Sequence, residues 1–186
     1  MRRVALVLAI GSIAALGLAI PAYADSRTCT GTIGAITIDG DVNVPQGATC
    51  RLNGTRVDGN VKVNNNARLF ATDVFVGGSV QSDGQRRTEV TGGSKVIGDV
   101  QIEQGKSGLV RGSAVNGTIS VKQNTGPQVI AGNTVDSDVQ VFTNTGGVRI
   151  SNNVIDGNLQ CKSNNPPPTG GGNQVQGEKE DQCASL

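Results

Sequence analysis

Two aspartates and one arginine come nearest to a catalytic arrangement in this chain. Asp136 and Asp138 lie two positions apart in Val135-Asp-Ser-Asp-Val139, and Arg149 stands in the next apolar segment. Two carboxyl groups about 5–9.5 Å apart are the apparatus of glycoside hydrolysis. Carboxylates beside a basic residue also suit cation-assisted proton abstraction, as in polysaccharide lyases. These residues therefore form the candidate active site of a polysaccharide-active enzyme (lyase, hydrolase or epimerase type) that acts on acidic polysaccharide.

The placement of the acids favours a structural interpretation. Asp39 and Asp58, like Asp136 and Asp156, occupy equivalent positions in neighbouring copies of a repeat, whereas a catalytic site would interrupt the repeat. The chain has no histidine and no Cys-x-x-Cys, so the usual metal-ligand patterns are missing. We therefore predict no catalytic, metal or cofactor site and prefer a non-enzymatic protein, with the enzyme as the alternative.

One compact basic segment, Arg86-Arg87-Thr-Glu89, has no aromatic residue beside it and is interpreted as a solvated corner. The formal net charge of the whole chain is +1. A nearly neutral surface gives no electrostatic reason to bind nucleic acid.

The elements that must position these residues follow from a phrase that returns every 19 or 20 residues. Its copies include Val57-Asp-Gly-Asn-Val-Lys-Val63 and Val96-Ile-Gly-Asp-Val-Gln-Ile102. A fixed period of this size is typical of a stacked solenoid. The central residue of the phrase, called the anchor here, recurs at Gly40, Gly59, Gly78, Gly98, Gly117, Ser137, Gly157 and Gly177.

Apolar residues alternate with polar ones around each anchor, which is the pattern of a β-strand with one buried face. Like residues fall into columns, among them Val57, Val76 and Val96. A left-handed hexapeptide helix needs coils of about 18 residues. The longer period therefore predicts an all-β, single-domain, right-handed parallel β-helix of about seven coils.

Two kinds of corner column accompany the strands. Gly, Asn or Asp recurs five residues before most anchors and predicts a bend with positive φ. Side-chain amides recur elsewhere and predict stacked hydrogen-bonded ladders, with plain turn chemistry as the alternative. The bend column contains Ala35, Gly54, Asp73, Gly93, Gly112, Gly132, Asn152 and Gly172. The amide columns contain Asn66, Gln85, Gly105, Asn124, Asn144 and Asn164, and then Asn133, Asn153 and Asn173.

The four cysteines are spaced for one pairing. Cys29 and Cys50, and likewise Cys161 and Cys183, are about one repeat apart, so each pair lies on neighbouring coils. Neighbouring strands are roughly 4.8 Å apart, within the usual disulfide range of about 4.4–6.8 Å between Cα atoms. The spacing predicts disulfides Cys29–Cys50 and Cys161–Cys183 at the two ends of the stack.

The first 24 residues have the pattern of a secretory signal peptide. Arg2 and Arg3 precede an apolar run, and Ala22-Tyr-Ala24 is a small-x-small cleavage pattern. We expect a secreted product of residues 25–186 with net charge −1 once the two arginines are removed. It would be a monomer with no membrane contact after cleavage. Its coils would span about 33–163, followed by a C-terminal cap over 164–186.

Together these repeats resemble secreted right-handed parallel β-helix proteins of the pectate-lyase-like superfamily. The Val-x-Gly-Asn/Asp-Val-x-Val phrase also resembles that of bactofilins, and the tail Pro166-Pro-Pro-Thr-Gly with Glu180-Asp-Gln-Cys183 is similar to short secreted proteins of actinobacterial type. The resemblance implies the fold and carries no activity. We expect a structural or binding solenoid associated with the cell envelope, with an extracellular polysaccharide or cell-wall component as its partner.

Overall fold

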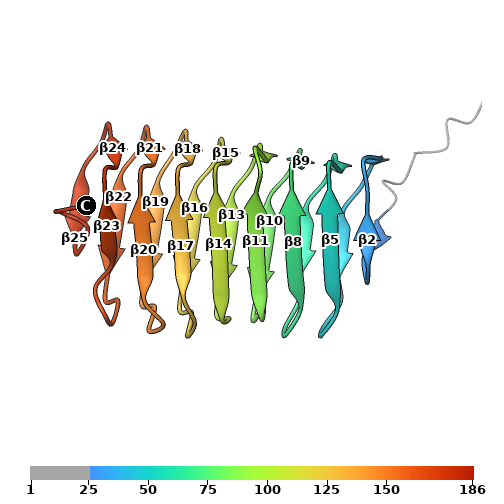
Figure 1. Ribbon diagram of the computed structural model, residues 1–186, viewed down its shortest axis with the longest axis horizontal. Coiled ribbons are helices and arrows are strands. Elements are labelled where there is room, and N and C mark those ends of the chain that lie inside the picture. Colours follow the sequence, from blue (N-terminus) through green and yellow to red (C-terminus); the bar gives the residue numbers. More distant parts are fainter. Residues whose placement is uncertain (1–25) are drawn as a thin grey trace, which may run out of the picture.

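The chain forms a parallel β-solenoid in which each coil adds one short strand to each of three sheets (Figure 1). The computed structural model describes residues 26–186, so the expected leader 1–24 lies outside the described residues. The three sheets, named A, B and C here, follow one another around the coil. In the view of Figure 1, sheet B faces the reader, sheet C lies along the top and sheet A lies behind.

Short strands build all three sheets. Sheet A contains β1 (Arg27–Thr28), β4 (Val42–Val44), β7 (Val61–Val63), β10 (Val80–Asp83), β13 (Val100–Glu103), β16 (Ile119–Lys122), β19 (Val139–Phe142), β22 (Leu159–Lys162) and β25 (Lys179–Asp181). Sheet B contains β2 (Thr32–Ile33), β5 (Thr49–Asn53), β8 (Arg68–Thr72), β11 (Arg87–Thr91), β14 (Ser107–Arg111), β17 (Gln128–Ala131), β20 (Val148–Ser151) and β23 (Thr169–Gly171). Sheet C contains β3 (Thr37–Ile38), β6 (Arg56–Val57), β9 (Phe75–Val76), β12 (Lys95–Val96), β15 (Ala114–Val115), β18 (Thr134–Val135), β21 (Val154–Ile155) and β24 (Gln174–Val175).

The solenoid prediction is confirmed, with one change in its length. Each strand from β1 to β22 pairs in parallel with the strand three places further along, so consecutive coils stack directly. Sheets B and C each have 8 strands, which gives about eight turns instead of seven. The difference arises because the segment expected as a cap, 164–186, continues the ladders with β23, β24 and β25. The right-handed sense of the coil stays a prediction from the sequence.

The core is a set of aliphatic columns that run along the stack. Val57, Val76 and Val96 are register partners in sheet C and have no exposed surface. The sheet B column is continuous, because Ala71 and Val90 stand in register between Leu52 and Val110. Burying one such Val or Ile stabilises the fold by about 1.5–3 kcal/mol. One coil cannot bury its own apolar face, so stability comes from the stack.

Both predicted disulfides are present, one near each end. The Cα atoms are 5.4 Å apart in Cys29–Cys50 and 5.2 Å apart in Cys161–Cys183. At the C-terminal end, Cys183 and Leu186 join the hydrophobic cluster of the core. The second disulfide therefore attaches the last turn of the chain to the coil that precedes it.

The corner between sheets B and C follows the predicted bend column. Positive φ angles occur at all of its members except Ala35, for example at Gly54 (62°), Asp73 (53°) and Asn152 (57°). These residue types adopt this conformation at the lowest steric cost. In every coil after the first, a residue with positive φ at this position thus turns the chain from sheet B into sheet C.

Candidate functional site: polar ladders and surface charges

The most regular polar feature is a column of side-chain oxygens directly after the anchors, called the oxygen ladder here. Each oxygen accepts a hydrogen bond from the backbone N–H of the equivalent residue in the next coil. The Asp41 Oδ1 to Asn60 N distance is 2.8 Å, and the Asp138 Oδ1 to Asn158 N distance is 2.7 Å. Its accepting members are Asp41, Asn60, Ser79, Asp99, Asp138 and Asn158.

The oxygen ladder explains why glycine occupies the anchor. A Cβ atom placed on Gly59, Gly98 or Gly157 would come within 3.0 Å of the ladder oxygen of the preceding coil and of the backbone there. Real Cβ atoms essentially never approach so closely. The one anchor that carries a side chain is Ser137, and the residue before it in the ladder column is Thr118. The Thr118 hydroxyl lies 3.2 Å from the Ser137 hydroxyl, so the two side chains bond to each other.

The candidate catalytic residues lie in different parts of the coil. Asp136 and Asp138 flank the anchor Ser137 at the corner between sheets C and A, whereas Arg149 lies in β20 of sheet B. Asp136 is exposed, and Asp138 belongs to the oxygen ladder. Arg149 borders a shallow depression of about 510 Å³ that is otherwise lined by Ser151, Asn152 and residues 169–172. The structure does not bring the three groups together.

Asp41 is the ladder carboxylate with the most complete set of partners. Its Oδ1 accepts the backbone N–H of Asn60, and its Oδ2 accepts a hydrogen bond from Lys62 Nζ at 2.7 Å. The backbone hydrogen bond, followed by the contact with Lys62, lowers the pKa of Asp41 below its ordinary value of 3.8. The charged form of Asp41 is therefore the one that stabilises the coil.

Asp41→Asn is expected to reduce the amount of stability that the protein loses at acid pH. The pKa of Asp41 is lower in the folded chain than in the unfolded chain, so its contribution is present above about pH 4 and is lost as the pH falls through the folded value. Asparagine keeps the ladder oxygen, as Asn60 and Asn158 do naturally. The check is the melting temperature between pH 7 and pH 2.

Lys62→Gln is the companion variant, and it should remove only part of the pH effect because the Asn60 N–H remains. Parallel acid profiles for Asp41→Asn and the wild type would contradict this account.

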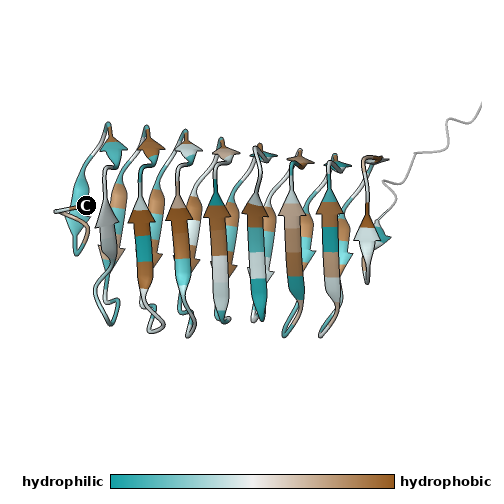
Figure 2. Cartoon of the chain, in the orientation of Figure 1, coloured by the Kyte–Doolittle hydropathy of each residue, from teal (hydrophilic) through white to brown (hydrophobic). Residues whose placement is uncertain are grey.

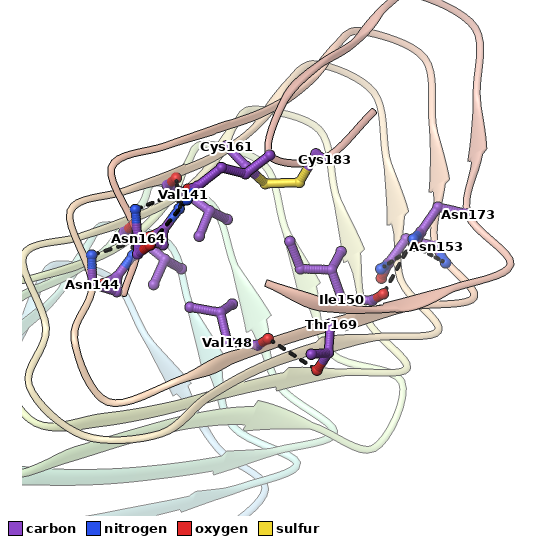
Figure 3. The surroundings of a disulfide bond; sticks show 12 residues. Val141, Asn144, Val148, Ile150, Asn153, Cys161, Asn164, Thr169, Asn173 and Cys183 are labelled. Atoms are coloured by element: carbon purple, nitrogen blue, oxygen red, sulfur yellow. Dashed lines mark hydrogen bonds between the residues drawn. A yellow bond between two sulfur atoms is a disulfide. The ribbon is translucent and has the colours of Figure 1, made fainter. Parts of the chain in front are cut away.

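Two further ladders are buried at corners of the coil, on opposite sides of the core (Figure 3). In the first, the backbone and side-chain N–H groups of Asn124 both donate to Asn144 Oδ1, at 3.0 and 3.1 Å. The same pattern repeats from Asn144 to Asn164 and ends on Gln182. In the second, it runs through Asn133, Asn153 and Asn173. The predicted amide ladders are confirmed for these residues.

The prediction was wrong at Asn66. Asn66 is exposed with a φ of 57°, and Ala67 takes the buried position of the column. The buried position is eight residues after the anchor here and seven after later anchors, because three residues (64–66) separate the strand Val61–Val63 from Ala67, whereas Gly84 alone separates Val80–Asp83 from Gln85. Gly105 also lacks an amide, and there Gln85 Nε2 reaches past it to Asn124 Oδ1 at 3.2 Å.

The aromatic residues of the described chain each lie beside a cation one coil away. Arg51 lies over Phe70, Arg56 over Phe75 and Lys122 over Phe142, with the charged atom 4.1–5.4 Å from the ring centroid. Such exposed pairs contribute about 0.5–1 kcal/mol each. They are spread over different sheets and do not form one stacking surface.

Within residues 26–186, no group of three or more His, Cys, Asp or Glu side chains is placed to hold a metal ion. No helix in that part of the chain is long and apolar enough to cross a membrane. Comparison with family models, with curated proteins and with solved structures found no match to this chain.

Proposed function

We propose that this chain is a non-enzymatic, secreted structural or binding solenoid of the cell envelope. It acts outside the cell after the leader 1–24 is removed, as a monomer, and its partner is an extracellular polysaccharide or cell-wall component. The proposal does not involve nucleic acid or membrane contact.

The observation that carries the proposal is that the polar side chains are engaged in bonds between neighbouring coils. Asp41, Asp99 and Asp138 hold neighbouring coils together, and the buried asparagines do the same from inside. An enzyme needs titratable groups that converge in a cleft. Here the acids are distributed along the stack, and Arg149 lies on sheet B, whereas Asp136 lies at the corner between sheets C and A. The two disulfides support an oxidising, extracellular setting.

Incubation of residues 25–186 with pectin and with alginate tests the non-enzymatic part. We expect no release of unsaturated products or new reducing ends from either polymer, because no acid–base pair is assembled. Asp136→Asn and Asp138→Asn serve as matched variants. Turnover by the wild type that either substitution abolishes would establish the enzyme instead.

Binding is measured on an array of envelope and extracellular glycans. We expect retention of at least one polymer class and no signal with duplex DNA. Failure to retain any glycan or cell-wall fraction would refute the proposed binding role.

A further inference from the structure

We propose that four cations on neighbouring coils form a binding site for phosphate groups carried by a polysaccharide. The site, called the cation cluster here, consists of Arg68, Arg86, Arg87 and Lys106. It rests on the proposed function, because it names the place and the chemistry by which the solenoid would hold an envelope polymer.

The register of the coils places the four residues at adjacent positions. Arg68 and Arg87 are register partners in β8 and β11. Arg87 is in turn the partner of Ser107, which places Arg86 beside Lys106 at the start of the next strand. Arg86, Arg87 and Lys106 are exposed, and Arg68 is partly exposed. Two pairs of like charges therefore lie side by side on three consecutive coils.

The carboxylates near the cluster, within the part of the chain that the structure describes, neutralise its charge only in part. Glu89 forms an ion pair with Arg87, whereas no ion pair within residues 26–186 involves Arg68, Arg86 or Lys106. Asp83 lines the same depression as Lys106 without pairing with it. The cluster keeps a surplus of positive charge even when both acids are counted.

The strands of sheet B as a whole carry a net positive charge. Its strands contain five arginines, no lysine and one acid, which is Glu89. Hydrophilic bands cross several of these strands in Figure 2. The arginines are Arg51, Arg68, Arg87, Arg111 and Arg149.

Phosphate is the anion that best fits this arrangement. Like charges directly opposite each other on neighbouring strands repel and destabilise a sheet. A phosphomonoester carries nearly two negative charges and three acceptor oxygens, so one group can accept hydrogen bonds from both members of a pair. A carboxylate offers one charge and two oxygens. Arginine suits this use because its planar fork donates two parallel hydrogen bonds.

A shallow hollow beside the cation cluster could accommodate a sugar unit. Arg87 and Arg111 lie on the rim of a shallow hollow of about 230 Å³, which is also lined by Ser107, Leu109 and Val129. The apolar side chains offer a surface to the C–H face of a ring, while the arginines lie at its edge. This combination favours a phosphorylated polysaccharide over free phosphate.

The test measures binding of residues 25–186 to dextran phosphate, with unmodified dextran, polygalacturonate and inorganic phosphate as comparison ligands. We expect binding to dextran phosphate that weakens as salt rises. It should also weaken from pH 7.5 to pH 5, because the second phosphate proton has a pKa of about 6 while the four cations stay charged.

Arg68→Gln and Arg87→Gln, singly and together, are the diagnostic variants, with Arg149→Gln on the same sheet as the matched control. Each diagnostic change should weaken binding about tenfold, the size of one charge-assisted hydrogen bond. The control should bind as the wild type does. The melting temperature of unliganded Arg68→Gln at low salt should equal or exceed that of the wild type, because a like-charge contact is removed.

Three outcomes would overturn the cluster as a phosphate site. One is equal binding of polygalacturonate and dextran phosphate at both pH values. Another is an equal loss in Arg149→Gln, and the third is full binding by free phosphate alone. If the wild type retains a cell-wall polymer and the double variant retains it equally, the cluster is refuted while the proposed binding function stands. If no polymer is retained, the proposed function itself fails.

Discussion

Asn144→Ala is expected to lower the free energy of unfolding by about 2–5 kcal/mol, since each buried polar group left without a partner costs about 1–3 kcal/mol. Asn144 Oδ1 accepts both N–H groups of Asn124, and its Nδ2 donates to the carbonyl of Val121 at 2.9 Å. All three residues are buried, so water cannot replace these partners without opening the coil. Alanine would also leave a void beside the core columns.

Chemical denaturation with the disulfides intact measures the effect. Thr145→Ala, at the exposed neighbouring position, is the matched control and should change stability by less than about 0.5 kcal/mol. If both variants unfolded at the same denaturant concentration, the buried asparagines would be simple turn residues and the ladder would carry no energy.

The repeat was enough to predict the columns of the core and the disulfides. Val57, Val76 and Val96 stack as expected because one copy of the phrase forms one coil, so equivalent positions become vertical neighbours. The pairing of Cys161 with Cys183 follows from the same rule, since the two cysteines are about one repeat apart. Strict periodicity converts distance along the sequence directly into distance in space.

Details that depend on the length of individual turns could not be predicted from the repeat. The turn after Val61–Val63 is longer than the turn after Val80–Asp83, so Ala67 occupies the buried position that was predicted for Asn66. The cation cluster was also missed, because Arg68 and Arg87 become neighbours only through the register of β8 and β11. In the sequence they are one coil apart, and the Arg86-Arg87 segment alone looks like a solvated corner.

The sequence does contain a signal for the oxygen ladder. Nearly every anchor is followed by Asp, Asn, Ser or Thr, all of which carry an oxygen that can accept a hydrogen bond from a backbone N–H. In Asp138 this structural use was hidden by the appearance of a carboxylate pair with Asp136. At the glycine anchors, the side-chain oxygen that follows one anchor occupies the space that a side chain at the next anchor would need.

Gly157→Ala tests this packing of the glycine anchor against the ladder oxygen directly. The new Cβ would come within 3.0 Å of Asp138 Oδ1 and of the backbone of Ser137, so the coil must move apart or give up the bond to Asn158. Overpacking of this kind costs about 1–3 kcal/mol. Gly34→Ala is the control, because a Cβ there meets no atom within 4 Å, and it should leave stability unchanged or slightly higher.

The natural exception at Ser137 provides a rescue. Asp138→Thr combined with Gly157→Ser recreates the Thr118–Ser137 arrangement one coil further along, where two hydroxyl groups bond across the coils at 3.2 Å. We expect the double variant to lose less stability than the sum of Asp138→Thr and Gly157→Ser, by at least about 0.5 kcal/mol in a double-mutant cycle. If the two stability losses were strictly additive, the residue at the anchor would not depend on the ladder side chain of the preceding coil. Coupling would mean that each anchor residue is chosen by the side chain of the coil before it, so the acids beside the anchors are fixed by packing and need no catalytic role to account for them.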